Sequence, residues 1–341
     1  MPRYYVGLDV HKKTVSYCMK KVGGTIVDEG ILPATRESLG KWASQLPKGW
    51  VGGMEATLFT GWIYDFLKPY AGDLHVGHPL SLKAITTAKK KSDPLDASTL
   101  ANLLRCNLFP DCYMAPSEIR ELRRVLRYRN LLVRESTRMK NRASGLLMEV
   151  GASYNKEKLH GKKYFTSLLD NLRDVPSSVV GLLRLTRTNI GIFESAQRRL
   201  LRALAEHPRL KERVELLQSI PGVGEILALT WALETGEPER FPSVAAAVSY
   251  CGLCSALDES AGKRKRGPLS KQRNRHLQYG LIEAAKLAPR YNRQLAAVHR
   301  RAIQRGADRN CATLTVARKL MSYLLSVDKS GKPFAYREEA V

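Results

Sequence analysis

The chain has 341 residues, of which 44% are hydrophobic, so it can bury a large core, and its length suggests two or three domains. Lysine and arginine outnumber aspartate and glutamate by 56 to 32, and the net charge of +24 favours a polyanionic partner, nucleic acid before a membrane surface. The size excludes a small disulfide-stapled scaffold, and six scattered cysteines indicate reduced thiols. Because no run approaches eighteen apolar residues and no apolar leader opens the sequence, we expect a cytoplasmic protein that does not contact membranes.

The first 80 residues alternate between β-rich and helical patterns. Three β-rich runs predict an antiparallel meander, and two helical patterns then alternate with two short strands. The predicted strands are YYVGLDV, TVSYCMK, TIVDEGILPAT, WVGGMEAT and DLHVGHP. This order, β-β-β-α-β-α-β-α, resembles the RNase H-like fold, which we expect for an α/β N-terminal domain at 1–112.

A long basic helix is predicted after this domain. Ile119, Leu122 and Leu126 follow helical spacing, and arginines fill the other faces. After the break GASYNKEKLHGKKY, the helical period resumes near Leu182 and continues to Leu217. We expect a helical, coiled-coil arm at 113–214 that dimerises and lies along nucleic acid, although an ordinary packed bundle would show the same pattern.

The third domain, at 215–341, is predicted to be mainly helical and to begin with a helix-hairpin-helix. In LLQSIPGVGEILALTWALETG, a Pro-Gly-x-Gly turn separates two apolar helical runs. Gly222 and Gly224 would let backbone N–H groups approach a DNA phosphate at the helix start. A tight turn between helices without a ligand is the alternative interpretation.

The segment from Ala261 to Ile282 contains no acid, and we expect it to be a loop. Its lysine and arginine residues are separated by Gly, Pro and Ser. This composition suits binding to a polyanion better than a self-contained fold. A solvated loop without a partner is the alternative. The candidate nucleic-acid-binding residues here are Lys263, Arg264, Lys265, Arg266, Lys271, Arg273 and Arg275.

Four acids stand at positions that an RNase H-like sheet would bring together. Asp9 ends the first strand, Glu55 ends the strand after the first helix, and Asp93 and Asp96 open a later helix, where Pro94 suits the first turn. An N-cap role for Asp93 and simple exposure of the strand-end acids are the alternatives. Clustered carboxylates repel one another and need a cation, and hard oxygen ligands suit Mg²⁺ or Mn²⁺ beside phosphate. The preceding Lys89, Lys90 and Lys91 would hold the polyanion there.

Seven motifs, in this order over nearly the whole chain, resemble the DEDD transposases of insertion-sequence family one-ten, the bridge-RNA-guided recombinases. They are VGLDVHK, GGMEAT, KKSDPLDA, SIPGVGEILA, CGLCSALDES, LSKQRN and KSGKPF. The resemblance implies a RuvC-like nuclease domain, a coiled-coil arm and a C-terminal transposase domain. It also implies that Asp9, Glu55, Asp93 and Asp96 bind Mg²⁺ and that Ser260 is the nucleophile; spacing alone does not choose Ser260 over Ser255 or Ser270.

By the same resemblance, we expect Ser260 to attack a DNA phosphodiester, to form a covalent 5'-phosphoserine, and to be released by strand exchange. The implied partners are donor and target DNA, a noncoding guide (bridge) RNA and further copies of the chain in a dimer or tetramer, in a bacterial cytoplasm and associated with the nucleoid. Ala261, Ser255 and Arg273 depart from the family pattern and bear on the geometry of the serine loop. The main alternative is a metal-dependent nuclease or Holliday-junction-resolvase-like hydrolase in which Ser260 is structural.

Overall fold

The computed structural model describes residues 4–85, 93–260 and 263–336, with side chains for all of these except 93–94, 256–260 and 263–266. The chain divides into two compact units, Met1–Ser117 and Glu118–Val341. Within the described residues, no helix is both long enough and apolar enough to cross a membrane. The predicted division into 1–112, 113–214 and 215–341 stays a prediction.

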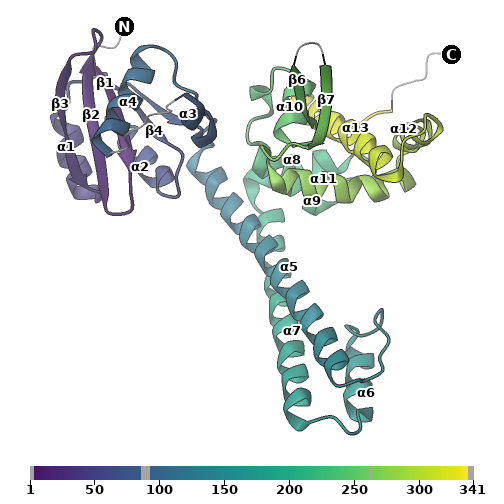
Figure 1. The fold of residues 1–341 in the computed structure, drawn as a ribbon. Helices are drawn as coiled ribbons and strands as arrows, with labels where there is room; N and C mark the ends of the chain where they lie inside the picture. Colours follow the sequence, from purple (N-terminus) through teal and green to yellow (C-terminus); the bar gives the residue numbers. More distant parts are fainter. Residues whose placement is uncertain (1–3, 86–92, 261–262, 337–341) are drawn as a thin grey trace. The chain divides into compact units, whose positions relative to one another are not determined.

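A five-stranded mixed sheet forms the centre of the first unit (Figure 1). Its strand order is β3-β2-β1-β4-β5, with β1 to β3 antiparallel and β4 and β5 parallel to β1. This confirms the predicted meander and the parallel strands that follow it. The strands are β1 (Tyr4–Val10), β2 (Thr14–Lys21), β3 (Ile26–Pro33), β4 (Val51–Glu55) and β5 (Asp73–Gly77).

The helices of this unit cover the sheet on both faces. On one face, Val6, Leu8 and Val10 of β1 share a core with Leu39 and Ile63 from the first two helices. The alternate residues of β1 therefore point to the opposite face, which α4 covers. The helices are α1 (Arg36–Gln45), α2 (Thr60–Leu67), α3 (Pro79–Ile85) and α4 (Asp93–Arg105).

The second unit begins with an antiparallel pair of long helices, α5 (Ser117–Glu149) and α7 (Ser177–Ala205), which we call the helical arm. Lys140 of α5 contacts Glu194 of α7 at 2.8 Å. The short helix α6 (Lys162–Asn171) was not predicted, because the sequence analysis placed a break there. Its Phe165 is buried against the arm, and that tertiary contact stabilises a helix too short to stand alone.

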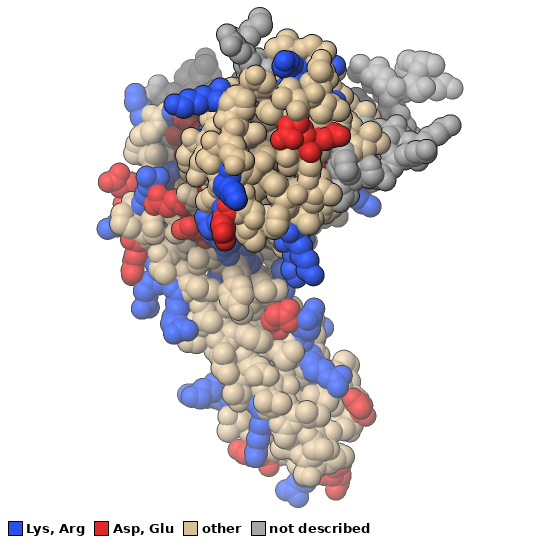
Figure 2. Space-filling view, turned by 90° about the vertical axis from the view of Figure 1, so that its left-hand side faces the viewer, with Lys and Arg blue, Asp and Glu red and all other residues tan. Residues whose placement is uncertain are grey.

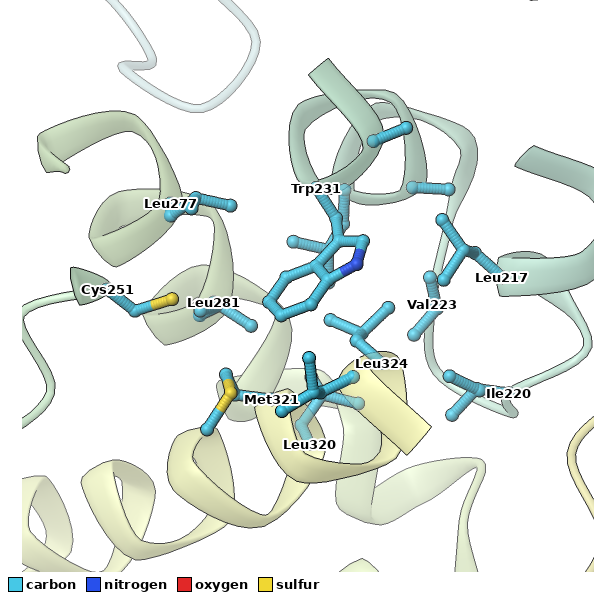
Figure 3. Packing of buried hydrophobic residues seen from close by; sticks show 14 of the residues in the cluster. Leu217, Ile220, Val223, Trp231, Cys251, Leu277, Leu281, Leu320, Met321 and Leu324 are labelled. Carbon is cyan, nitrogen blue, oxygen red and sulfur yellow. The ribbon is translucent and has the colours of Figure 1, made fainter. Parts of the chain in front are cut away.

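Six further α-helices and a β-hairpin complete the described part of this unit, and its core includes Trp231, which is fully buried (Figure 3). Its indole Nε1 donates to Asp328 Oδ2 at 2.8 Å, and the surrounding side chains are apolar. The elements are α8 (Pro208–Gln218), α9 (Glu225–Thr235), α10 (Val244–Tyr250), β6 (Ser255–Ser260), β7 (Lys263–Leu269), α11 (Arg275–Leu287), α12 (Arg293–Gln304) and α13 (Arg309–Ser330).

The expectation of a loop from 261 to 282 was wrong for most of its length. Residues from Lys263 form β7, and α11 begins at Arg275. In the hairpin register, Asp258 lies opposite Lys265 and Glu259 lies opposite Arg264. The partner strand β6 lies outside the basic segment, so the composition of that segment alone does not predict the hairpin.

Candidate active site

The packing of α4 on the sheet depends on a glycine in β1. A Cβ at Gly7 would overlap the carbonyl oxygen of Ala97 and come within 2.6 Å of the Ala101 nitrogen. In β4, Gly53 pairs with Gly7, and a Cβ there would lie 2.9 Å from Leu104 Cδ1. The two glycines therefore let the backbone of α4 lie against the strands, where larger residues would hold it away.

The direction of α4 decides which of its residues meet the ends of the strands. The last residue of α4, Arg105, lies against Gly24, which follows the end of β2. This end of β2 pairs with the start of β1. The middle of α4, at Ala97, lies over Gly7. Since α4 thus runs opposite to β1, its first turn, which begins at Asp93, lies toward the end of β1 that carries Asp9 (Figure 1).

The structure describes the side chains of three of the four predicted acids, Asp9, Glu55 and Asp96. All three lie at this end and on this face of the sheet. Asp9 and Glu55 are each two residues beyond the paired glycines, and side chains two apart on a strand point the same way. Asp96 is half-buried, and it directly precedes Ala97, the helix residue that lies over Gly7. The side chain of Asp93 lies outside the described residues, although its backbone begins α4.

The immediate surroundings of the strand-end acids are polar. The Asp9 side chain is 17% exposed, and its Oδ2 lies 3.1 Å from Nε2 of His11. The backbone oxygen of Glu55 accepts a hydrogen bond from Thr60 Oγ1 at 2.7 Å, which ties the end of β4 to the start of α2. Among the side chains that the structure describes, no three acids, histidines or cysteines form a group that could hold a metal ion.

Ser260 belongs to the second unit, and only its backbone position is described. It ends β6 and lies opposite Lys263, the first residue of β7. The hairpin joins the rest of the unit at its base, where Ser270 N donates to Cys254 O at 3.1 Å. The departures from the family pattern at Ser255 and Arg273 lie at the base of the hairpin.

The predicted basic residues are divided between described and undescribed parts of the chain. Arg273 packs its aliphatic stem against Gly252 and donates to Ser270 O at 2.8 Å, while Lys271 and Arg275 are exposed. The side chains of 263–266 and all of Lys89, Lys90 and Lys91 lie outside the described residues. On the face drawn in Figure 2, the Lys and Arg side chains of the helical arm lie separately among uncharged residues and some acids.

The two glycines of the predicted helix-hairpin-helix have different surroundings. Gly222 has φ +98°, and a Cβ there would lie 2.9 Å from the Ala288 Cα. Gly224 caps the start of α9 with φ −91°, is exposed, and a Cβ there would meet no described atom within 4 Å. Gly222 is thus required by packing and backbone conformation, whereas the backbone at Gly224 is open to a ligand.

A buried carboxylate, which was not among the predicted site residues, joins the arm to the start of α11. Glu234, with no exposed side-chain surface, accepts two hydrogen bonds from Arg127 and one from Asn274 at 2.8 Å. Asn274 also caps α11 by accepting from the backbone of His276 and Leu277. A single acid in the apolar run LALTWALETG was the available signal, because a lone charge in a buried helix needs a partner.

Two family models match the chain. Residues 214–300 match the Transposase IS116/IS110/IS902 family, and residues 6–151 match a model described as Transposase, the DEDD domain of IS110 elements. Together they cover most of the chain. These matches place it in the class of insertion-sequence transposases. With both domains present in order, the chain belongs to the IS110 family of transposases.

Two curated relatives are also named as transposases. A "Probable family 20 transposase" of Pseudomonas aeruginosa is 25% identical over 225 residues, which are 63% of this chain and 66% of that protein. A "Putative transposase y4qE" of Sinorhizobium fredii is 24% identical over 195 residues, or 57% and 47% of the two chains. The chain therefore spans two thirds or less of each of these relatives.

One solved structure has a low similarity. The T. thermophilus RuvC in complex with a Holliday junction substrate is 11% identical, with a TM-score of 0.25, and the match covers 32% of this chain and 99% of that one. At this TM-score the likeness supports no conclusion about the fold or the activity.

Proposed function

We propose that the chain is an RNA-guided DNA recombinase that moves its insertion sequence through a covalent serine intermediate. The single observation that carries the proposal is that Asp9 and Glu55 lie on paired strands, at one end and on one face of the first sheet, and that α4 begins at that end. Such a set of hard oxygen donors fits a divalent cation that also binds phosphate. Asp9, Glu55, Asp93 and Asp96 would hold Mg²⁺ or Mn²⁺.

The bound cation would supply positive charge for a phosphodiester and for a serine oxygen that attacks it. The Ser260 oxygen bonds to phosphorus, the bond to the 3' oxygen breaks, and that oxygen leaves with the proton that serine has lost. The products are a 5'-phosphoserine and a free 3'-hydroxyl. Attack by another 3'-hydroxyl reverses the step and rejoins the strands, so the phosphodiester energy is conserved without ATP.

The net charge of +24 supports nucleic acid as the partner, and the acid-free segment 261–282 lies next to the proposed nucleophile in the sequence. In this proposal a noncoding guide RNA pairs with donor and target DNA, and the protein binds backbone and shape. Two or four copies would assemble, so that the acids of one copy serve the serine of another. Sequencing the nucleic acid that co-purifies with the chain tests the guide; a random mixture would contradict it.

The covalent step is tested by mixing the full chain, its co-purified RNA, Mg²⁺ and end-labelled DNA, and separating the products on a denaturing gel. We expect a protein–DNA adduct from the wild type, from Ser255→Ala and from Ser270→Ala, but none from Ser260→Ala. The two controls remove the other serines of the same segment. Cleavage that continues undiminished in Ser260→Ala would support the alternative, a metal-dependent hydrolase or junction resolvase.

A second measurement tests the acids independently of the serine. Calorimetric titration with Mg²⁺ should show binding to the wild type and to Ser260→Ala that is lost in Asp9→Asn and Asp96→Asn. Asp65→Asn, in α2 and outside the acid set, is the matched control. Binding that persists unchanged in Asp9→Asn would remove the metal site from the proposal.

A further inference from the structure

A buried serine lies directly opposite Asp9 in the sheet. In the antiparallel ladder between β1 and β2, Asp9 pairs with Ser16, two positions from the pair of Gly7 and Cys18. Residues paired across two strands point to the same face, so Ser16 shares the face on which Asp9 and Glu55 lie. The proposed metal site therefore has a hydroxyl on the neighbouring strand in addition to its carboxylates.

The position of α4 places Ser16 beside the first turn of that helix. The Cys18 thiol contacts the Ser98 side chain of α4. Two strand residues span about 7 Å, and one helical turn spans about 5 Å. β2 and α4 run in the same direction. Ser16, two residues before Cys18 in β2, therefore lies beside the helical turn before Ser98, which contains Asp96.

The hydroxyl of Ser16 is buried without being used in the fold. The residue is 1% exposed, and within the part of the chain that the structure describes its Oγ has no hydrogen-bond partner. Buried hydroxyls in folded proteins nearly always have a partner, and leaving one without a partner costs stability that alanine at the same position would not cost. A buried hydroxyl without a partner beside the strand-end acids indicates a role in binding at the proposed metal site.

We propose that Ser16 is a positioning residue of the metal site. Its hydroxyl donates a hydrogen bond to the oxygen ligands around the cation, the Asp9 carboxylate first among them, and so fixes their orientation. Groups that hold metal ligands in this way change metal affinity by tenfold or more, although they do not touch the ion. The inference rests on the proposed function, since it assigns a supporting group to the same acids.

The test compares Ser16→Ala with Ser136→Ala in the full chain. Ser136 is also buried, at 4% exposure, and its Oγ likewise has no partner among the described residues, but it lies in α5. Both variants should keep or raise the melting temperature without metal, because each removes a buried hydroxyl that makes no hydrogen bond. We expect Ser16→Ala to weaken Mg²⁺ binding roughly tenfold by calorimetry. Ser136→Ala should bind like the wild type.

The conservative variant Ser16→Thr retains the hydroxyl and should recover most of the affinity that Ser16→Ala loses. Unchanged Mg²⁺ binding in Ser16→Ala, with binding still lost in Asp9→Asn, would overturn this inference and leave the proposed function intact. Absence of any Asp9-dependent Mg²⁺ binding in the wild type would overturn both. A lower melting temperature of metal-free Ser16→Ala would show that the hydroxyl serves the fold, and it would also contradict the inference.

Discussion

Arg127 of the helical arm donates two hydrogen bonds to the fully buried carboxylate of Glu234, from Nε at 2.8 Å and from Nη2 at 2.7 Å. The bidentate pair joins α5 to α9 inside the second unit. Asn274 extends it to the start of α11, and Tyr250 donates to the backbone oxygen of Glu234 at 2.9 Å. The geometry of the segment that follows the serine hairpin thus depends on a charge pair in the core.

Removing the arginine should destabilise the second unit strongly. Arg127→Ala leaves the buried Glu234 charge without its main partner, and we expect the free energy of unfolding to fall by about 3 kcal/mol. Arg124→Ala is the matched control, because Arg124 lies on the same helix, is 76% exposed and contacts Glu121 only at 3.8 Å. That change should cost less than about 0.5 kcal/mol. Urea unfolding of both variants makes the comparison, and equal losses would contradict it.

Acid should weaken the same part of the molecule. Burial by itself raises the pKa of Glu234, but the hydrogen bonds from Arg127 and Asn274 and the charges of Arg127 and Arg123 outweigh it and hold the pKa below its ordinary value of 4.5. The stability that the carboxylate contributes is therefore fully present above pH 4.5 and is lost as pH falls through the lower folded value. Unfolding free energy measured from pH 6 to pH 3 should fall less steeply in Glu234→Gln; identical slopes would contradict this.

The two glycines of the turn before α9 should respond differently to substitution. Gly222→Ala forces a side chain into positive φ and against Ala288, so we expect a loss of about 1–3 kcal/mol in thermal or urea unfolding. Gly224→Ala has room and ordinary φ, and its stability should stay within about 0.5 kcal/mol of the wild type. If the open backbone at Gly224 contacts DNA phosphate, this second variant should weaken DNA binding; unchanged affinity would make the turn purely structural.

Local patterns predicted the first sheet well. Alternating residues fixed β1 to β3 as a meander, and strand ends placed Asp9 and Glu55 near each other, because period-two alternation and strand order are properties of short segments. The helices of the arm were predicted from their apolar spacing for the same reason. By contrast, α6 and β7 were missed, because the packing of Phe165 and the pairing of β7 with β6 both involve residues outside the segment concerned.

The amino-acid sequence alone was enough to name the residues of the candidate site: the acids at the ends of the strands, the serine that the family motif selects, and the strong basic charge around them. The folded chain was needed to show that α4 lies on Gly7, that α4 runs opposite to β1, and that the Ser16 hydroxyl is buried opposite Asp9. It was also needed to show that Glu234 finds Arg127 across 107 residues. The physical reason is that helix direction, strand register and charge partners depend on close packing between distant segments, which no local periodicity encodes.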